Sequence, residues 1–251
     1  MYKSLNKREY IKTDPIFFPH GLNGNIEFVS FVSAVFAYGK VTQIQKFLNN
    51  FFSIFGNKPL LSKSKDSNLY YRFQKSSDIT HFVNFLDNLY EQYGSIQNLF
   101  YTLSSDLEVA LSEFVIYAKE YGTKVNAGRG YFFLFPDIKA SGAKRLRMFL
   151  RWMVRSDEVD FGIWSRYSKS ELKCPIDTHI LNFAKRMYII KNSNNNYTNL
   201  NIITEYFKKL NPLDPVKYDF SITRLGILYK CQFIMSDNCS KCMFMDLCSL
   251  C

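Results

Sequence analysis

Four cysteines lie close together in the segment CQFIMSDNCSKCMFMDLC. They are Cys231, Cys239, Cys242 and Cys248, with seven, two and five residues between them. Four thiolates at such spacing can enclose one metal centre, because the two-residue gap lets two sulfurs bind from one turn while the longer gaps bring the others round. Tetrahedral zinc and a four-iron cluster both accept this ligand set, so the number of ligands leaves both open.

Two other cysteines stand apart from this group. Cys174 is expected to be a small buried apolar residue, and Cys251 is either a spare thiol or a replacement for one of the four. The N-terminal residues show no apolar run followed by a small-residue cleavage site, which predicts a cytoplasmic protein. In that reducing compartment, metal binding or redox chemistry explains clustered thiols better than disulfides do.

The segment AKRLRMFLRWMVR, which starts at residue 143, is a second candidate for chemistry. Helical periodicity separates an apolar side from a basic side, and the basic side carries Lys144, Arg147, Arg151 and Arg155. Gly142 leaves the first N–H groups of this helix approachable, and these groups attract a phosphate together with the helix dipole. The predicted nucleic-acid contacts are Gly142, Arg145, Arg147 and Arg151. The alternative is a solvated face of an ordinary amphipathic helix.

A single aspartate begins another predicted helix, in the segment KCPIDTHILNFAKR. Pro175 disfavours helix for the residue before it, and Asp177 stands where its side chain can cap the free N–H groups that follow. Structural capping is one interpretation of this aspartate. At the rim of a cleft the same carboxylate can also stabilise a positive charge or orient a water, and the two roles are compatible.

The rest of the sequence predicts an all-α protein. Apolar residues recur at spacings of three and four, about ten helices fit, and polar stretches starting at residues 56, 122 and 191 predict loops. The longest apolar stretch, residues 28–38, is too short to cross a bilayer and predicts a buried helix. We therefore expect no membrane partner and a monomer in the cytoplasm.

The charge balance favours a polyanionic partner without naming it. The chain has 32 Lys and Arg against 22 Asp and Glu, a net charge of +10. Nucleic acid is the natural candidate for such a protein. Many basic proteins bind no nucleic acid, so the charge alone does not decide the matter.

The cysteine segment resembles the cluster loop of the endonuclease III-like branch of the helix-hairpin-helix DNA glycosylase superfamily. In that branch four cysteines spaced six, two and five hold a [4Fe-4S] cluster, and the first gap here is one residue longer. The segment RLGILYKC, with Gly226 before Cys231, is similar to the glycine-containing helix that leads to the first cysteine ligand in that branch. The resemblance implies a [4Fe-4S] cluster as the cofactor, with zinc as the alternative.

Two further segments carry the same resemblance. PIDTHILNFAKR resembles the VDTH segment of the family, whose aspartate begins a helix at the mouth of the base pocket and is catalytic, and Asp177 has the matching position. Lys144 lies 33 residues upstream, across an insert of about residues 156–173. This distance is similar to that of the catalytic lysine in archaeal 8-oxoguanine glycosylases.

One departure affects the expected hairpin. The family carries an LPGxG turn before the lysine, whereas FPDIKASGAKR has one glycine. Either the hairpin is remodelled or the lysine has another role. The whole pattern, including DPIFFPHG from residue 14, also resembles a bacterial family of uncharacterised proteins.

The resemblance implies an all-α, two-lobed glycosylase-like fold with a C-terminal cysteine-ligated metal loop. Residues 25–155 would form a helical barrel-like lobe that ends in the basic helix. Residues 1–24 and 156–251 would form the second helical lobe, which carries the four-cysteine loop.

The implied activity is that of a DNA base-excision glycosylase with abasic-site lyase activity. It would act on double-stranded DNA with a damaged base, which must be flipped out of the stack before a side chain reaches it. Lys144 would attack C1′ as a neutral amine, helped by the adjacent charges of Arg145 and Arg147, and Asp177 would stabilise the sugar cation. The alternative is a non-catalytic DNA- or RNA-binding relative that keeps the fold and the cluster, with Lys144 as a phosphate contact.

Overall fold

The computed structural model describes residues 1–59, 68–231, 233–242 and 245–248. Twelve α-helices and four short 3₁₀ helices occur in these ranges, and no β-strand does. The expected all-α fold is therefore confirmed. Cys251 and part of the loop expected after residue 56 lie outside the described residues. Every helix in the described ranges is too short or too polar to span a bilayer.

The helices divide into an earlier and a later set along the chain. The earlier set is α1 (Tyr2–Leu5), α2 (Phe17–Gly21), α3 (Ile26–Val35), α4 (Val41–Phe55), α5 (Ser76–Tyr93), α6 (Ile96–Leu103), α7 (Leu107–Lys124) and α8 (Arg129–Leu134). The later set is α9 (Lys144–Val154), α10 (Thr178–Arg186), α11 (Tyr197–Leu210) and α12 (Asp219–Leu228). The 3₁₀ helices are η1 (Arg8–Thr13), η2 (Lys169–Glu171), η3 (Asp237–Lys241) and η4 (Met245–Leu247).

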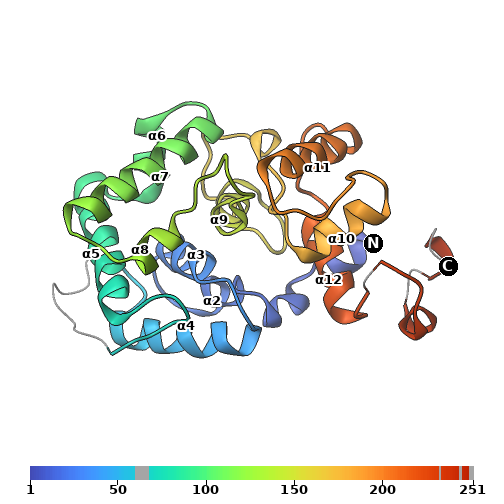
Figure 1. Ribbon diagram of the computed structural model, residues 1–251, viewed down its shortest axis with the longest axis horizontal. Helices are drawn as coiled ribbons and strands as arrows, with labels where there is room; N and C mark the ends of the chain where they lie inside the picture. The colour runs from blue at the N-terminus through green and yellow to red at the C-terminus, as the bar shows by residue number, and fades with distance from the viewer. Residues whose placement is uncertain (60–67, 232, 243–244, 249–251) are drawn as a thin grey trace.

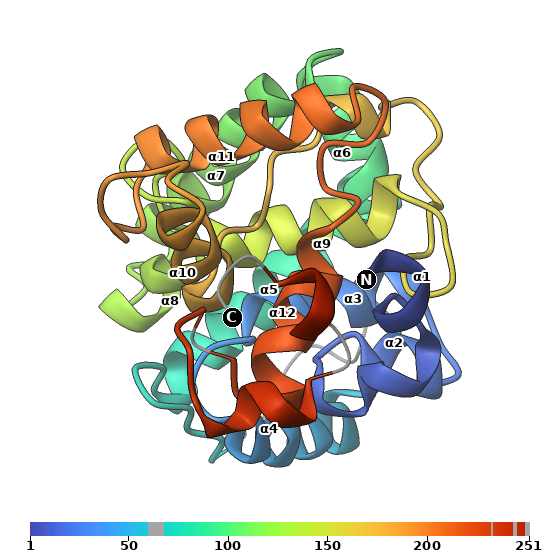
Figure 2. The ribbon, with the colours of Figure 1, turned by 90° about the vertical axis from the view of Figure 1, so that its right-hand side faces the viewer.

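Helix α9 occupies the centre of the molecule. In Figure 1 it is seen nearly end-on, with α4 to α8 on one side and α10 to α12 on the other. Figure 2, turned by 90°, shows α9 crossing the middle of the structure between α4 and α11. Helix α3 packs against α9, and α1 packs against α12 although the two are far apart in sequence.

The buried helix expected at residues 28–38 is α3. Its residues from Glu27 to Val35 are all buried, as is usual for a helix that is apolar on every side. Phe31 packs edge-on against Phe149 of α9, with 5.0 Å between the ring centroids. An aromatic core thus fixes α9 from its apolar side.

The loop expected at residues 122–130 is shorter than the sequence suggested. Gly122 lies inside α7, and the chain leaves helix only between Lys124 and Arg129. A Cβ at residue 122 would collide with the ring of Tyr131. This glycine therefore permits close packing instead of a turn, which sequence alone does not distinguish.

The arginines on the basic side of α9 are buried, which corrects the expectation of an outward-facing arginine stripe. Arg147 and Arg151 are 2% and 5% exposed. Arg151 donates hydrogen bonds to Asp160 at 2.9 Å and to Asp219 of α12 at 2.9 Å. Periodicity assigned these residues correctly to one face, but the face meets carboxylates inside the protein.

Arg155 extends the same network toward the N-terminus of the chain. It pairs with Asp160 at 2.7 Å and with Asp214 at 2.9 Å, and it contacts Asp157. Its guanidinium also donates to the Tyr2 hydroxyl of α1 at 2.9 Å. We call these residues the buried ion-pair network; its members are Arg151, Arg155, Asp157, Asp160, Asp214 and Asp219.

Loss of one cation from the buried ion-pair network is expected to destabilise the fold. Arg151→Met should lower the free energy of unfolding by about 3–5 kcal/mol, because Asp219 is left as a buried charge without its cation, while Asp160 retains only its pairing with Arg155. Urea denaturation followed by circular dichroism measures this change. Arg151→Met with Asp219→Asn should recover part of the loss, and Arg186→Ala, at an exposed arginine, should leave the midpoint nearly unchanged. A loss below about 1 kcal/mol for Arg151→Met would contradict the structural role of the network.

Candidate active site

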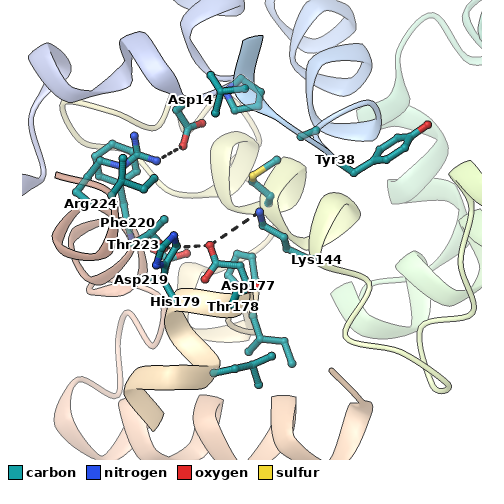
Figure 3. Close-up of a pocket in the computed structure, with 18 of the residues that line it drawn as sticks. Asp14, Tyr38, Lys144, Asp177, Thr178, His179, Asp219, Phe220, Thr223 and Arg224 are labelled. Carbon is teal, nitrogen blue, oxygen red and sulfur yellow. Dashed lines mark hydrogen bonds and ion pairs between the residues drawn. The ribbon is translucent and has the colours of Figure 1, made fainter. Parts of the chain in front are cut away.

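A cavity of about 590 Å³ lies where the first turns of α9 and α10 approach α12 and the segment before α2. Its lining combines charged, polar and apolar side chains. The lining includes Thr13, Asp14, Tyr38, Gly39, Lys144, Met148, Arg151, Asp177, His179, Asn195, Asp219, Phe220, Thr223 and Arg224. Figure 3 shows these walls and the two ionic contacts between them.

Lys144 and Asp177 face each other in this cavity. The Lys144 Nζ lies 3.9 Å from the Asp177 Oδ2, and the two side chains are 34% and 14% exposed. Lys144 is the first residue of α9, and Asp177 is the residue immediately before α10. Both residues line the same cavity, so an amine and a carboxylate from different helices meet in one place (Figure 3).

The two oxygens of Asp177 have separate partners. Oδ1 accepts a hydrogen bond from the N–H of Ile180 at 2.9 Å, so Asp177 caps α10 as the sequence predicted. Oδ2 accepts a hydrogen bond from the Thr223 hydroxyl of α12 at 3.3 Å and faces Lys144. The cap therefore holds the carboxylate in place while its other oxygen stays directed into the cavity.

The turn before Lys144 explains how α9 begins at the cavity. Ala143 has a left-handed backbone with φ of 42°, which is uncommon for a residue with a Cβ. Gly142 is buried, and a Cβ there would collide with Asn195 and Ile176. The single glycine of the expected hairpin is thus used for close packing, and the left-handed position is filled by alanine.

Helix α12 approaches α10 closely because of a second glycine. A Cβ at Gly226 would collide with the imidazole ring of His179. Gly226 thereby lets α12 bring Thr223 within reach of Asp177. This contact gives the glycine a packing role.

Another wall of the cavity comes from residues that the sequence did not indicate. Arg224 of α12 donates to Asp14 at 2.9 Å and to Thr13 Oγ1 at 3.0 Å, and Figure 3 shows Asp14 across the cavity from Lys144. Burial lowers the pKa of Arg224, and Asp14 opposes that shift. Asp14 is the first residue of the DPIFFPHG segment, but the sequence does not show that it contacts Arg224. The contact between Thr223 and Asp177 is equally invisible in the sequence.

Asp219 is a member of the buried ion-pair network that also lines the cavity. Burial raises the pKa of its carboxyl to about 6, and the Arg151 charge opposes that rise. Both residues line the cavity. Two members of the buried ion-pair network therefore form part of the cavity wall.

The three arginines expected to contact phosphates are turned into the protein. Arg145 donates to the carbonyl oxygens of Val35 and Phe133, both at 2.6 Å. Arg147 makes two 2.7 Å hydrogen bonds to Glu108. Because these guanidinium groups and that of Arg151 are buried and already hydrogen-bonded, we leave them out of the proposed nucleic-acid contacts.

The four cysteines of the expected metal loop are described, and each is partly exposed. Burial raises the pKa of Cys231, the hydrogen bond from the N–H of Phe233 lowers it, and the charges of the other three thiols raise it. Backbone N–H groups of Phe233 and Ser236 donate to the sulfurs of Cys231 and Cys239, both at 3.3 Å. Among the described residues, no three metal-binding side chains converge on one point, so the ligand set stays a prediction.

The capping role of Asp177 is separable from any catalytic role by two substitutions. Asp177→Ala should lower the free energy of unfolding by about 0.5–2 kcal/mol, because the N–H of Ile180 loses its acceptor. Asp177→Asn should change it little, because asparagine caps helices about as well as aspartate does. Thermal denaturation of both variants checks this difference, and equal losses would show that the charge itself, through Lys144, stabilises the fold.

Comparison with known proteins places the chain in a family. Residues 14–228 match the family described as "Protein of unknown function (DUF2400)". The matched region contains Lys144, Asp177 and Thr223 and ends before Cys231. No curated protein and no solved structure matches the chain. Because the family match covers most of the sequence, the protein belongs to the DUF2400 family.

Proposed function

We propose that this protein is a DNA base-excision glycosylase with abasic-site lyase activity. The observation that carries the proposal is the pairing of Lys144 and Asp177, 3.9 Å apart, inside a cavity. A lysine amine can form a Schiff base with a sugar, and a carboxylate beside it can assist proton transfer. The membership in the glycosylase superfamily rests on the sequence resemblance and is part of the proposal.

The cavity has the size and lining that a flipped nucleotide needs. Its volume of about 590 Å³ falls within the roughly 300–1,000 Å³ of small-molecule sites. Met148 and Phe220 offer apolar surface for a base, and Thr13 and Asn195 offer polar groups. A base inside duplex DNA would have to leave the stack to enter this cavity.

Lys144 would act as the nucleophile in its neutral form. Its nitrogen attacks C1′, the bond from C1′ to the base breaks, and the bonding electrons leave with the base, which takes up a proton. The nitrogen then loses a proton, and its lone pair forms the C1′=N bond as the C1′–O4′ bond breaks and O4′ takes up a proton, which leaves a protonated Schiff base between Lys144 and C1′. Elimination of the 3′ phosphate from this intermediate would be the lyase step.

Asp177 would supply negative charge where the sugar becomes positive. The oxygen that faces Lys144 is Oδ2, while Oδ1 is held by the N–H of Ile180. A carboxylate fixed before the reaction stabilises a developing cation without reorganising. The same oxygen is the carboxylate atom closest to the lysine amine for proton transfer.

Binding of the DNA backbone would depend on features other than the buried arginines. The first turn of α9 has no side-chain cap, so its N–H groups and the helix dipole favour an anion near Lys144. The net charge of +10 favours the same polyanion over a longer range. This binding should weaken steeply as salt is added, because bound counterions are released from DNA.

Cys231, Cys239, Cys242 and Cys248 would hold a [4Fe-4S] cluster. The cluster would hold the segment after α12 in a fixed conformation by joining its four cysteines, and no redox step is needed. The N–H donors to two of the sulfurs suit thiolate ligands, because such hydrogen bonds stabilise negative charge on sulfur. Zinc remains the alternative metal for the same four residues.

Borohydride trapping tests the proposed nucleophile. Wild-type protein should form a covalent adduct with DNA that contains an abasic site, and Lys144→Gln should form none, because its amide cannot make a Schiff base. Denaturing gel electrophoresis of labelled DNA measures the adduct. Lys173→Gln is the matched control, since Lys173 is also partly buried and hydrogen-bonded yet lies outside the cavity lining.

The same assay separates the enzyme from its alternative, a non-catalytic DNA- or RNA-binding relative. That alternative predicts salt-sensitive DNA binding without any trapped adduct and without base release from a panel of damaged bases. Asp177→Asn should leave DNA affinity nearly unchanged while lowering turnover. An adduct of equal yield in wild type and Lys144→Gln would remove Lys144 from the mechanism.

Spectroscopy of anaerobically purified protein tests the cluster. A brown protein with an absorbance shoulder near ~400 nm and bound iron and sulfide is expected. Cys239→Ala should lose this absorbance and lower the thermal stability of the protein. Colourless protein with stoichiometric zinc would show that the four cysteines bind zinc and not an iron–sulfur cluster.

A further inference from the structure

A group of aromatic side chains is exposed beside the cavity. Tyr70 is 67% exposed, Phe73 is 56% exposed and Phe133 is 41% exposed. The ring of Tyr38 lies against Phe73 and Phe133, with centroid distances of 6.3 and 5.1 Å. We call Tyr38, Phe73 and Phe133 the aromatic platform. Exposed apolar groups that lie together on a protein surface often mark a binding site.

The aromatic platform is continuous with the candidate active site. Tyr38 and the next residue, Gly39, both line the cavity. Tyr38 therefore belongs to the cavity wall through one part of its surface and to the platform through another. A strand whose sugar sits at Lys144 would place a neighbouring nucleotide near these rings.

A tight turn holds the platform in a fixed shape. Tyr71 and Gln74 exchange backbone hydrogen bonds of 3.0 and 2.9 Å, which leaves Arg72 and Phe73 at the tip. The side chain of Gln74 donates to the carbonyl oxygen of Gly130 at 2.8 Å and accepts from the Tyr38 hydroxyl. These buried bonds fix the turn to Tyr38 and to the start of α8.

Arg72 adds a cation to the rings. Its guanidinium carbon lies 5.8 Å from the ring centre of Tyr38 and 5.6 Å from that of Phe73. Arg72 has a left-handed backbone with φ of 52°, and Gly39 opposite it has φ of 103°. A Cβ at Gly39 would lie 2.5 Å from an Arg72 nitrogen. Two unusual backbone positions thus bring this arginine over the aromatic surface.

The charge around the platform suits a nucleic acid. The segments 70–75 and 129–133 contain three charged side chains, all basic and exposed: Arg72, Lys75 and Arg129. Aromatic rings with adjacent arginines bind the flat faces of nucleobases, and cations bind the phosphates between them. Bases within an intact duplex have both faces covered by their neighbours, so only unpaired bases can stack on such a surface.

We propose that the aromatic platform stacks an unpaired base next to the nucleotide held in the cavity, and that the preferred DNA is therefore single-stranded or locally melted beside the lesion. The inference rests on the proposed function, because it assumes a nucleotide at Lys144. It goes beyond that function by naming the secondary structure of the substrate. Phe73 is the main contact, since it is the most exposed ring of the platform.

Fluorescence anisotropy with three DNAs tests the proposal. Each carries the same uncleavable tetrahydrofuran abasic analogue, placed in a single strand, beside a mismatched bubble, or in a fully paired duplex. Wild type should bind the first two more tightly than the third. Phe73→Leu should weaken binding to the first two by about tenfold or more, as loss of a stacked base does, and should leave binding to the paired duplex within about twofold.

Two variants control for loss of fold and for nonspecific loss of apolar surface. Phe73→Tyr should retain wild-type affinity, because it keeps a stacking ring. Phe17→Leu, at another phenylalanine that is 43% exposed and outside the cavity lining, should bind all three DNAs as wild type does. Matching melting temperatures show that each variant is folded.

The outcomes separate this inference from the proposed function. Tightest wild-type binding to the paired duplex, or an equal effect of Phe73→Leu on all three DNAs, would overturn the platform while leaving the trapping result untouched. Phe73-dependent binding of unpaired DNA without any borohydride adduct would support the platform and overturn the enzyme. Absence of DNA binding by wild type would overturn both.

Discussion

The pairing of Arg151 with Asp160 and Asp219 is the interaction on which the arrangement of the site depends. It joins the centre of α9 to the first residue of α12 in an environment where an unpaired charge is strongly destabilising. Lys144 begins α9, and Thr223 on α12 holds Asp177. The buried charges in the cavity wall therefore help to fix the distance between the amine and the carboxylate. This constraint favours one geometry over others, since neither helix can shift without separating a buried ion pair.

The site itself is built from helix ends. The first turn of α9 presents Lys144, the cap of α10 presents Asp177, and Gly226 lets α12 approach closely enough to contact the cap. A reaction at these helix ends needs few additional groups, because the backbone already fixes the positions of Lys144 and Asp177. The segment before α2 and α12 close another wall through Asp14 and Arg224. The fold thus supplies a cavity, a fixed carboxylate and an amine, which together support the proposed reaction.

Periodicity predicted the elements that carry the site better than it predicted their surroundings. The helices beginning at Lys144 and after Asp177 were correct, as was the cap, because each depends on residues only a few positions apart. The arginines of α9 were placed on the right face but not in the right environment. Their partners, Glu108, Asp160 and Asp219, come from distant segments that a linear pattern does not bring together. The predicted loop at Gly122 was wrong for a similar reason, because this glycine lies inside a helix and packs against Tyr131, which only the fold brings close. Asp14, Thr223 and the aromatic platform were missed because each acts through contacts across the tertiary structure.

Peptide mapping of the reduced adduct shows directly whether the amine of Lys144 bonds to the sugar carbon beside Asp177. Wild-type protein would be trapped on abasic DNA with borohydride, digested with nuclease and protease, and sequenced by mass spectrometry. We expect the residual sugar mass on the peptide that contains residue 144, at that lysine. Residual mass at Lys173, at the N-terminal amine or spread over surface lysines would contradict it.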